Sequence, residues 1–387
     1  MTGTDPAPPH AFALRLTDDL ALRLRERHHA PALQALLTRE RAHLAGSLTW
    51  AAELEADTAA RMIDAGLAQF RRGDGWQADL CWRGEVVGGM GLHYLDGPGG
   101  STEVGFWLRQ AFEGRGLVTR AVAALQRHFF EARGLGRVAI GVVPGNGRSE
   151  AVARRLGYRP EAVLRRAHAG PDGVTDLAFH GLLASEWRSA GGAGAAPGTS
   201  PLPRFALRVD DEIELGLFER EDAAALHPLI VANQPRLLPW MPWAAAPTPE
   251  ATQGFVAGRA LAAIVEGDGF EAGVYWRGRL VGAVGVHGVR HRAPRGEIGY
   301  WLAAEAEGHG VIARAVRAVT DKAFADWGFE RVEIRADPLN RRSRAVPERL
   351  GFVLEGVLRL EERGLDGFAD RAVYAVLREE WPTAASG

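Results

Sequence analysis

One stretch of this chain occurs twice, and the repetition limits what the chain can fold into. Residues 103–120 read EVGFWLRQAFEGRGLVTR, and residues 297–314 read EIGYWLAAEAEGHGVIAR. The two copies are 194 positions apart, as Glu103 and Glu297 illustrate. Each copy alternates like a β-strand, passes through a loop with two glycines and then starts an apolar pattern of helical period. The fold must therefore provide the same strand, loop and helix at two places.

The repetition extends over whole domains. Segments that begin at Phe12 and Phe205 also match, at a displacement of 193. This period is far longer than that of a solenoid repeat, and 387 residues suit two domains that each bury a core. We expect an N-terminal domain over residues 12–188, a Gly/Ala/Pro-rich linker over residues 189–203 and a C-terminal domain over residues 204–382.

The charge balance and the cysteine count exclude several kinds of protein. The chain has 46 Lys and Arg against 48 Asp and Glu, a formal charge of −2, so no overall field favours nucleic acid or an anionic membrane. Cys81 is the single cysteine, which excludes an intramolecular disulfide and a multi-cysteine metal site, and we expect no metal. No leader-like segment opens the chain and no run of about eighteen apolar residues occurs, so we expect a soluble, cytoplasmic protein.

The local patterns favour a mixed α/β (α+β) fold in each half. After the glycine loop, apolar residues recur at helical spacing, at Val118, Ala121, Val122 and Leu125. A strand, a second helix that opens at Asn146 and a closing hairpin follow, and the second half repeats each of them. Strands and helices thus alternate within one domain, and this domain occurs twice.

Aromatic segments precede a further helix in each half. The first half predicts a single helix over residues 51–71, just after Trp50, and the second half carries tryptophans and prolines over residues 238–243. These rings either cover the edge of the core or line a substrate cleft, and both interpretations remain open.

The glycine loop can bind an anion. Gly114 and Gly116, like Gly308 and Gly310, let the backbone approach a ligand just where a helix begins, and free N–H groups and the helix dipole there favour phosphate. A turn that simply needs two glycines is the alternative. A P-loop is not indicated, because no Gly-Lys-Ser/Thr follows, and the third glycine of a dinucleotide fingerprint is replaced by Thr119.

An ordered set of motifs surrounds this loop in both halves. Glu, an apolar residue, Gly, an aromatic residue, Trp and Leu lead into Glu-Gly-x-Gly and a helix, and Asn-x-x-Ser and Leu-Gly-aromatic follow a later strand. The set resembles the GNAT acetyltransferases, most closely their RimJ/RimL branch of ribosomal-protein N-terminal acetyltransferases, from Phe12 to Trp187 and from Phe205 to Trp381. The resemblance implies two GNAT-like domains, each with a mixed, mostly antiparallel central sheet flanked by helices.

The resemblance also implies an acetyl-CoA site in each half. Its residues in the first half would be Trp107, Leu108, Arg109, Glu113, Gly114, Arg115, Gly116, Leu117, Val118, Thr119 and Asn146. Those in the second half would be Trp301, Leu302, Ala303, Glu307, Gly308, His309, Gly310, Val311, Ile312, Ala313 and Asn340. The loop would hold the pyrophosphate, and the strand end that precedes it would pair with the pantetheine arm.

The chain departs from the family's pattern in two places. Ala111 and Glu305 stand three residues before the first glycine, where Gln or Arg is common, and Arg120 and Arg314 replace the usual Glu of Thr-Glu-Ala. Backbone N–H groups together with Arg115 or His309 could meet the phosphate instead.

Direct acetyl transfer needs a base for the attacking ammonium and a hydrogen-bond donor for the departing thiolate. The resemblance suggests bases at Glu103 and Glu297 and thiolate donors at Ser149 and Ser343. His168 and Glu362, also 194 apart and at the same point of the last hairpin, are a second candidate pair of bases. Each has a plainer interpretation: charged strand ends for the first pair, a surface histidine for His168 and helix capping for the serines. No Ser-His-Asp or Cys-His set points to a covalent acyl-enzyme.

These patterns lead to a functional hypothesis with one rival. We expect acetyl transfer from acetyl-CoA to a primary amine, either a peptide N-terminus or a small molecule, in a ternary complex without nucleic acid or membrane. The rival is a CoA-binding sensor or interaction module with one or both halves inactive. Pro347, where the first half has Ala153, is a candidate for distorting a helix of the second half. The halves could form an internal pseudo-dimer, in a monomer or a homodimer.

Overall fold

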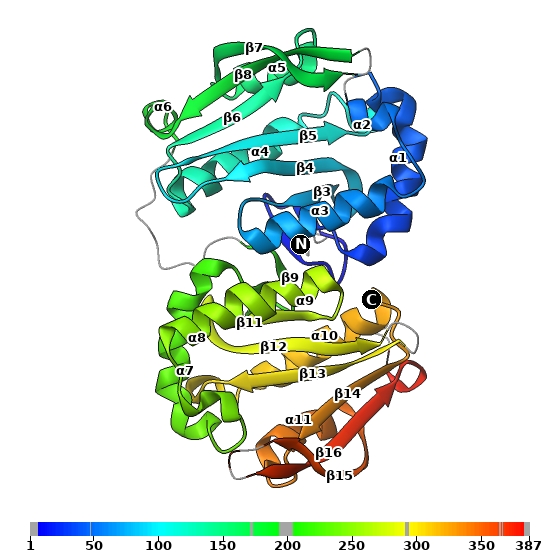
Figure 1. Ribbon diagram of the computed structural model, residues 1–387, viewed down its shortest axis with the longest axis vertical. Helices are drawn as coiled ribbons and strands as arrows, with labels where there is room; N and C mark the ends of the chain where they lie inside the picture. Colours follow the sequence, from blue (N-terminus) through cyan, green and yellow to red (C-terminus); the bar gives the residue numbers. More distant parts are fainter. Residues whose placement is uncertain are drawn as a thin grey trace. The chain divides into compact units, whose positions relative to one another are not determined.

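The computed structural model describes residues 7–46, 48–170, 173–192, 204–290, 294–363, 365 and 367–382. It separates into two units, Met1–Phe205 and Ala206–Gly387. The predicted linker falls largely outside the described residues. Within each unit the elements follow one another in nearly the same order (Figure 1).

The described residues of the first unit form eight strands and the helices that connect them. Its elements are β1 (Ala13–Arg15), β2 (Leu20–Leu24), η1 (Arg27–His29), α1 (Ala30–Leu44), α2 (Thr49–Ala52), α3 (Thr58–Arg72), β3 (Gln77–Trp82), β4 (Glu85–Leu95), β5 (Ser101–Leu108), η2 (Gln110–Phe112), α4 (Leu117–Arg127), η3 (His128–Ala132), β6 (Arg137–Val142), α5 (Gly147–Arg155), β7 (Arg159–Gly170), β8 (Gly173–Leu183) and α6 (Ala184–Ser189).

The second unit repeats this plan. Its elements are β9 (Ala206–Arg208), β10 (Ile213–Leu217), η4 (Arg220–Asp222), α7 (Ala223–Leu237), η5 (Pro242–Ala245), α8 (Pro249–Gly254), η6 (Phe255–Ala260), α9 (Leu261–Glu266), β11 (Phe270–Trp276), β12 (Arg279–Arg290), β13 (Arg295–Leu302), η7 (Ala304–Ala306), α10 (Val311–Ala325), β14 (Arg331–Ala336), α11 (Arg341–Leu350), β15 (Val353–Arg363), β16 (Phe368–Leu377) and η8 (Arg378–Glu380).

The sheet of each unit is mostly antiparallel, as predicted. The strand order is β1-β2-β3-β4-β5-β6-β8-β7 in the first unit and β9-β10-β11-β12-β13-β14-β16-β15 in the second. Among the described strands, β5–β6 and β13–β14 pair in parallel, and the other pairs within each unit are antiparallel. Helices lie on both faces; in the first unit Figure 1 shows α3 in front of the strands and α4 behind them.

The helix after the glycine loop forms as its spacing predicts. Val118, Ala121, Val122 and Leu125 are buried on one side of α4, and Val311, Ala315, Val316 and Val319 are buried on α10. Each helix begins directly after a glycine in the left-handed region, Gly116 with φ 70° and Gly310 with φ 68°. Burial of the apolar face fixes the helix against the sheet, and the glycine allows the left-handed backbone turn from which the helix begins.

The expectation of one helix over residues 51–71 is wrong. α2 ends at Ala52 and α3 begins at Thr58, because side chains of α1 bind the backbone between them. Arg41 Nη2 donates to the carbonyl of Ala52 at 2.6 Å, and Gln34 Nε2 donates to that of Glu55 at 2.8 Å. These bonds satisfy carbonyl groups that a continuous helix would use internally.

The second unit has one residue more in the matching region. The displacement between the copies is 193 at Trp50 and Trp243 and 194 at Leu67 and Leu261. A π-helical turn, η6 (Phe255–Ala260), lies in this interval. Because a π turn holds one residue more than an α turn, η6 takes up the insertion without disturbing the strands that follow.

Within the described part of the chain, no helix has the length and apolar character that crossing a bilayer requires.

Candidate active site

The parallel strands of each unit separate after a short paired stretch. β5 and β6 pair from Ser101 and Arg137 to Glu103 and Ala139, and β13 and β14 pair to Glu297 and Glu333. Beyond these residues the edge of β5 that faces β6, like that of β13 facing β14, has no strand partner among the described residues. Its free N–H and C=O groups can pair with an amide-bearing ligand, as the resemblance implies for Trp107 to Arg109 and Trp301 to Ala303.

The glycine loops are open toward solvent at their glycines. Gly114 and Gly308 have φ values of 73° and 81°, a conformation that side chains other than glycine rarely adopt. A Cβ added at Gly114, Gly116, Gly308 or Gly310 would meet nothing within 4 Å. The loops therefore leave room for a ligand to approach the backbone.

The helix that each loop starts has free N–H groups. No side chain caps α4 or α10, and the first helical bonds run from Arg120 to Gly116 and from Arg314 to Gly310. The N–H groups of Leu117, Val118 and Thr119, like those of Val311, Ile312 and Ala313, thus lack helical acceptors. Free donors, open space and a helix dipole fit the pyrophosphate of a nucleotide-linked carrier.

The glutamate before the first glycine of each loop forms ion pairs with side chains of two helices. The Glu113 carboxylate lies 2.7 Å from Nη1 of Arg148 at the start of α5 and 3.2 Å from Nε2 of His43 in α1. In the second unit Glu307 pairs with Arg342 at 3.0 Å and with Arg236 of α7. These ion pairs fix the loop relative to two helices and leave its backbone free for a ligand.

The second departure from the family's pattern, an arginine in place of the usual Glu, has a structural explanation. Arg120 pairs with Asp19 in the turn between β1 and β2, and this contact lowers the pKa of that carboxyl. Arg314 pairs with Asp210 at 2.8 Å and with Glu212 at 3.2 Å. The arginine that replaces the usual Glu thus ties the first turn of the helix to the edge of the sheet.

The side chains that follow the first glycine lie against a tryptophan. The guanidinium of Arg115 is 5.4 Å from the ring of Trp82, and the imidazole of His309 is 4.7 Å from that of Trp276. Both are positive or polar groups beside the open loop, and a cation over an aromatic face is stabilised there.

A pair of tryptophans stands at the strand end of each site. Trp50 and Trp107 have ring centroids 6.3 Å apart, and Trp243 and Trp301 have centroids 6.2 Å apart. Arg109, by contrast, directs its side chain to Glu40 and Glu85, so only its backbone remains available to a ligand.

The Asn-x-x-Ser motifs cap helices. Oδ1 of Asn146 accepts from the N–H of Ser149 at 3.2 Å, and Oδ1 of Asn340 accepts from that of Ser343 at 3.1 Å. The Ser149 hydroxyl has no hydrogen-bond partner among the described residues, whereas the Ser343 hydroxyl donates to the Tyr300 hydroxyl at 3.4 Å. The capping interpretation is therefore correct, and the caps use the backbone N–H groups of the serines and not their hydroxyls.

A cavity of about 790 Å³ opens in the second unit beside these groups. Its lining contains a group of apolar side chains, called the apolar wall below, and a group of polar and charged ones, called the charged floor. The apolar wall includes Trp240, Met241, Trp243, Phe255 and Trp301, and the charged floor includes Glu271, His287, Glu297, Glu333, Arg335 and Glu361. Asn340 and Ser343 also line it. The tryptophans of residues 240–243 thus line a cleft. Of the two interpretations left open for that segment, cleft lining is the one that applies.

The two strand glutamates have different surroundings. Nε of Arg335 lies 3.3 Å from Oε2 of Glu297, and other nitrogens of this guanidinium reach Glu333 and Glu361. Gly141 stands at the position of Arg335 in the first unit, and Oε1 of Glu103 lies against it. No hydrogen bond or ion pair holds the Glu103 carboxylate within the described residues.

The second pair of predicted bases is not joined to the first. His168 pairs with Thr175 across the hairpin β7–β8, and its Nε2 is covered and has no hydrogen-bond partner in the described structure. It is thus half-buried rather than a surface histidine. The backbone of Glu362 lies in β15, and its side chain is outside the described part of the chain.

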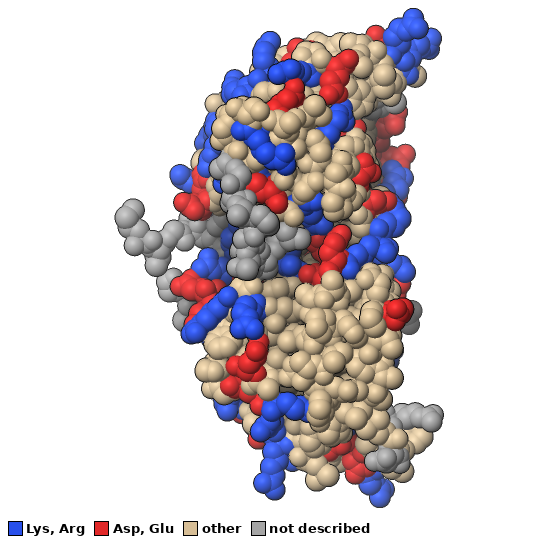
Figure 2. All heavy atoms as spheres, turned by 90° about the vertical axis from the view of Figure 1, so that its left-hand side faces the viewer, with Lys and Arg blue, Asp and Glu red and all other residues tan. Residues whose placement is uncertain are grey.

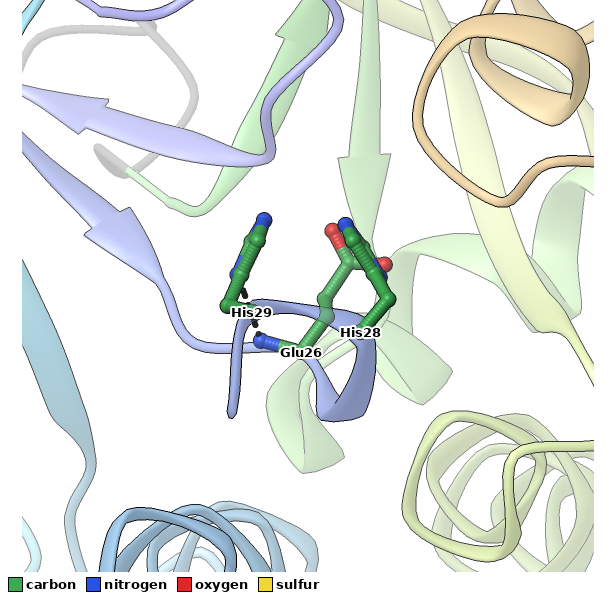
Figure 3. A group of neighbouring side chains, drawn as sticks. All are labelled: Glu26, His28 and His29. Carbon is green, nitrogen blue, oxygen red and sulfur yellow. Dashed lines mark hydrogen bonds between the residues drawn. The ribbon is translucent and has the colours of Figure 1, made fainter. Parts of the chain in front are cut away.

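A cluster of possible metal ligands lies at η1. Glu26, His28 and His29 offer ligand atoms within 4.8 Å of one another, and Figure 3 shows the Glu26 carboxylate beside the His28 ring. However, the backbone N–H of Glu26 donates to Nδ1 of His29 at 3.0 Å, as the dashed line in Figure 3 marks. The neutral ring therefore carries its proton on Nε2, which opposes metal binding there.

A family comparison identifies this arrangement. A profile of the family described as "Acetyltransferase (GNAT) domain" matches residues 19–159 and again residues 212–353. The chain therefore belongs to the GNAT acetyltransferase family, with one such domain in each unit. It is an N-acetyltransferase with acetyl-CoA as the acyl donor, and the open loop, the free N–H groups and the strand gap fit that donor.

Individual relatives agree with the predicted RimJ/RimL resemblance. YdaF of Bacillus subtilis, a candidate ribosomal N-acetyltransferase, is 36% identical over 180 residues, which cover 46% of this chain and 97% of YdaF. The ribosomal-protein-serine acetyltransferase of Escherichia coli is 23% identical over 171 residues, covering 44% of this chain and 96% of the relative.

Solved structures are also similar to parts of the chain. The microcin C7 self-immunity acetyltransferase MccE, solved with acetyl-CoA and AMP, is 26% identical, with a TM-score of 0.42 and coverage of 44% of this chain and 94% of that one. RimJ of Mycobacterium smegmatis, solved with a CoA disulfide, is 27% identical, with a TM-score of 0.42 and coverage of 45% and 85%.

Sequence reasoning missed the charged floor of the second cleft. Glu271, His287 and Arg335 reach one cavity from three strands, so their proximity depends on strand order and register. Comparing the two copies position by position would have drawn attention to two of them, because Gln77 and Gly141 stand at the places of Glu271 and Arg335.

Proposed function

We propose that the protein transfers the acetyl group of acetyl-CoA to a primary amine by direct attack in a ternary complex. The observation that supports this most is the open glycine loop, with three unpaired N–H groups behind it, beside a pair of strands that part at a glutamate. Such an arrangement would hold a phosphate chain at one end and place a carboxylate at the other.

We further propose that the acceptor is the N-terminal amine of a peptide or protein, or a small amine of apolar character. The names of the two relatives in Bacillus subtilis and Escherichia coli point to ribosomal proteins as acceptors. The tryptophans and Met241 on the wall of the second cleft would favour an apolar or peptide-like group next to the amine.

In the first unit, separate residues take the proton, assist the leaving sulfur and hold the pyrophosphate. Bound acetyl-CoA supplies a thioester carbonyl as the electrophile. Glu103 accepts a proton from the acceptor ammonium, directly or through a water, because its carboxylate has no competing partner in the described structure. The Ser149 hydroxyl donates a hydrogen bond to the sulfur as it leaves. The N–H groups of residues 117–119 hold the pyrophosphate and orient the reacting group.

A second candidate function rests on the ion pair between Arg335 and Glu297. A carboxylate that must break an ion pair to accept a proton is a poor base. A second unit that binds CoA without turnover, and acts as a sensor, would account for this contact.

We propose the domain boundaries 12–188 and 204–382 for each catalytic module, in a cytoplasmic protein whose two modules act as an internal pseudo-dimer. Figure 2 shows basic and acidic side chains interspersed on the face that it draws, so this face offers no broad basic surface for nucleic acid. Sedimentation equilibrium tests the pseudo-dimer: the mass of one chain supports it, and twice that mass indicates further pairing.

Calorimetric titration with acetyl-CoA tests the donor site. Two sites per chain are expected, and Gly116→Val and Gly310→Val should each remove one, because a branched side chain opposes the left-handed φ and fills the open loop. Thiol release with a serine-terminated peptide then tests catalysis. Absence of acetyl-CoA binding at millimolar ligand would refute the proposal; binding without turnover of any amine would favour the sensor.

A further inference from the structure

A histidine held by a buried carboxylate lies on the floor of the second cleft. Nδ1 of His287 in β12 is 3.1 Å from Oε1 of Glu271 in β11, and the two side chains are 30% and 10% exposed. Both line the cavity. A carboxylate only accepts hydrogen bonds, so this contact favours the ring proton on Nδ1 and leaves the lone pair of the neutral ring on Nε2.

Two glycines make room for this pair. Nε2 of His287 lies 2.5 Å from the place where a Cβ of residue 299 would be, and the Glu271 carboxylate lies over Gly285 in the same way. His287 also stands directly opposite Glu297 in the register of β12 and β13. The lone pair of Nε2 thus lies over β13, in the same row of side chains as the glutamate that the resemblance suggests as a base.

Glu297 itself is poorly placed to accept a proton. Arg335 lies between Glu297, Glu333 and Glu361, and its buried Nε makes no aligned hydrogen bond, so its attraction to Glu297 is one of charge at 3.3 Å. Protonation of Glu297 would remove that attraction. His287 loses no such contact when Nε2 takes a proton, because the imidazolium then faces a carboxylate on its other side.

The first unit keeps the histidine but not its carboxylate. His93 stands at the position of His287, and its Nε2 likewise lies over a glycine, Gly105. However, His93 is exposed, and Gln77 replaces Glu271. The Gln77 amide donates to Gln69 and to the carbonyl of Leu92, both at 3.3 Å. Glu103 meanwhile faces Gly141 instead of an arginine. Each unit thus has one glutamate or histidine placed to act as a base, and the two choices differ.

We propose that the two units use different bases: Glu103 in the first, and Nε2 of His287, with Glu271 as its positioning residue, in the second. The inference rests on the proposed function. In the second unit the acceptor ammonium gives one proton to Nε2 and becomes a neutral amine. Its nitrogen forms the C–N bond as the C–S bond breaks, and the second nitrogen proton goes to the departing thiolate, which leaves as CoA thiol. The imidazolium then returns its proton to water.

Turnover by the full-length chain tests the assignment. Glu103→Gln silences the first unit, and thiol release is measured with acetyl-CoA and either a hexapeptide with a free N-terminal serine or benzylamine. Adding His287→Asn should lower the remaining kcat roughly 100-fold, and adding Glu271→Gln should lower it less, with acetyl-CoA affinity unchanged by calorimetry. An unchanged kcat in the Glu103→Gln, His287→Asn chain would overturn the assignment.

The matched control uses the first unit. In a chain that carries His287→Asn and retains Glu103, the further change His93→Asn should alter turnover by less than about twofold, because His93 has no carboxylate to position it. If His93→Asn lowered turnover as much as His287→Asn does, the loss at both positions would have to come from a change in the cleft. His287 would then not be the base.

If neither amine reacts at the second unit, the tautomer of the His287 ring still tests the inference. Long-range proton–nitrogen spectra of the chain labelled with ¹⁵N-histidine identify the tautomer of each ring, and His287→Asn assigns the His287 signals. The neutral ring should carry its proton on Nδ1 and should change toward the Nε2–H form in Glu271→Gln. A ring that is Nε2–H in the unaltered chain refutes the inference whatever the turnover, while acetyl-CoA titration separately judges the proposed function.

Discussion

The hydroxyl of Tyr300 donates a hydrogen bond to the carbonyl oxygen of Ser343, with 2.8 Å between the two oxygens. The N–H that would meet this carbonyl inside α11 belongs to position 347, where Pro347 has none. The first unit has Phe106 and Ala153 at the corresponding positions. The tyrosine thus supplies the donor that the proline lacks, and α11 runs unbroken from Arg341 to Leu350. The suspected distortion of this helix is absent.

Tyr300→Phe should therefore destabilise α11 in a way that depends on Pro347. The loss of the hydroxyl leaves a carbonyl without its donor and should lower the local opening free energy by about 1 to 2 kcal/mol. In a Pro347→Ala background the alanine N–H takes over and most of this cost should disappear. Hydrogen exchange of α11 peptides measures the effect, with α5 peptides as the internal reference. Equal costs in the two backgrounds would show that Tyr300 acts by packing alone.

The reverse experiment in the first unit should reproduce the relationship. Ala153→Pro should cost about 3 kcal/mol, because it removes a helical N–H where Phe106 has no hydroxyl to offer. Combining it with Phe106→Tyr should recover part of that loss. Exchange protection of α5 in the single and double variants is the measurement; no recovery would mean that the tyrosine cannot reach the carbonyl in this unit.

A buried ion triad should make the first unit depend on Asp79. The Asp79 carboxylate lies 2.5 Å from Nη2 of Arg23 and 2.7 Å from Nε of Arg25. Burial raises the pKa of Asp79, but the two guanidinium groups outweigh it and hold that pKa below its ordinary value. Asp79→Asn should destabilise this unit by about 3 to 5 kcal/mol, because it leaves two arginines without their anion.

The second unit is the natural control for this change. It has Gly216, Phe218 and Gly273 at the corresponding positions. Exchange protection of β10 and β11 should therefore be unaffected by Asp79→Asn, while that of β2 and β3 falls. Loss of protection in both units to the same degree would contradict the assignment of the effect to the triad.

Acid should unfold the first unit before the second. Burial is the main cause that lowers the pKa of His29 and of His128 to about 3, with Arg23 and Arg133 adding to it. The unfolded chain, where a histidine has a pKa near 6.5, binds more protons between these values, so the stability present above pH 6.5 is lost as the pH falls toward 3. The second unit has Asp222 and Lys322 at these positions.

Exchange or proteolysis of the full-length chain from pH 7 to pH 4 checks this order. His128→Gln should reduce the acid sensitivity of the first unit, because glutamine binds no proton in this range. Simultaneous loss of both units along the titration would contradict the prediction.

The exposed tryptophan of the second cleft should affect the acceptor and not the donor. Trp243 is 52% exposed and stands beside Trp301 on the apolar wall. Trp243→Ala should raise the KM for an apolar amine about tenfold, by loss of contact area, while acetyl-CoA affinity stays the same. Steady-state kinetics in a Glu103→Gln chain measures it; an equal loss of acetyl-CoA affinity would place Trp243 at the donor site.

The sequence predicted the parts of the site that the two copies share. The fixed displacement of Glu103 and Glu297 identified the strand, and the glycines located the helix start, because local conformation demands those residues. The helix break after Ala52 was missed because it depends on side chains of α1, far away in the sequence.

The contact between Arg335 and Glu297 could not be predicted for a similar reason. Alternation indicated which face each residue of a strand would occupy, but the neighbour across the gap follows from the parallel register of β13 and β14. The same limit applies to His287 and Glu271, because the antiparallel register of their strands places Glu271 opposite Gly285, two residues from His287 on the same face.

The two open glycine loops belong to one polypeptide, so a cell always makes them in equal amounts. A substitution that spoils one cleft therefore leaves an undamaged copy of the other in the same molecule, at the same abundance. Selection then tolerates changes in the spare copy. One cleft can therefore acquire an arginine beside its glutamate and a carboxylate beside its histidine while the other cleft still catalyses the original reaction.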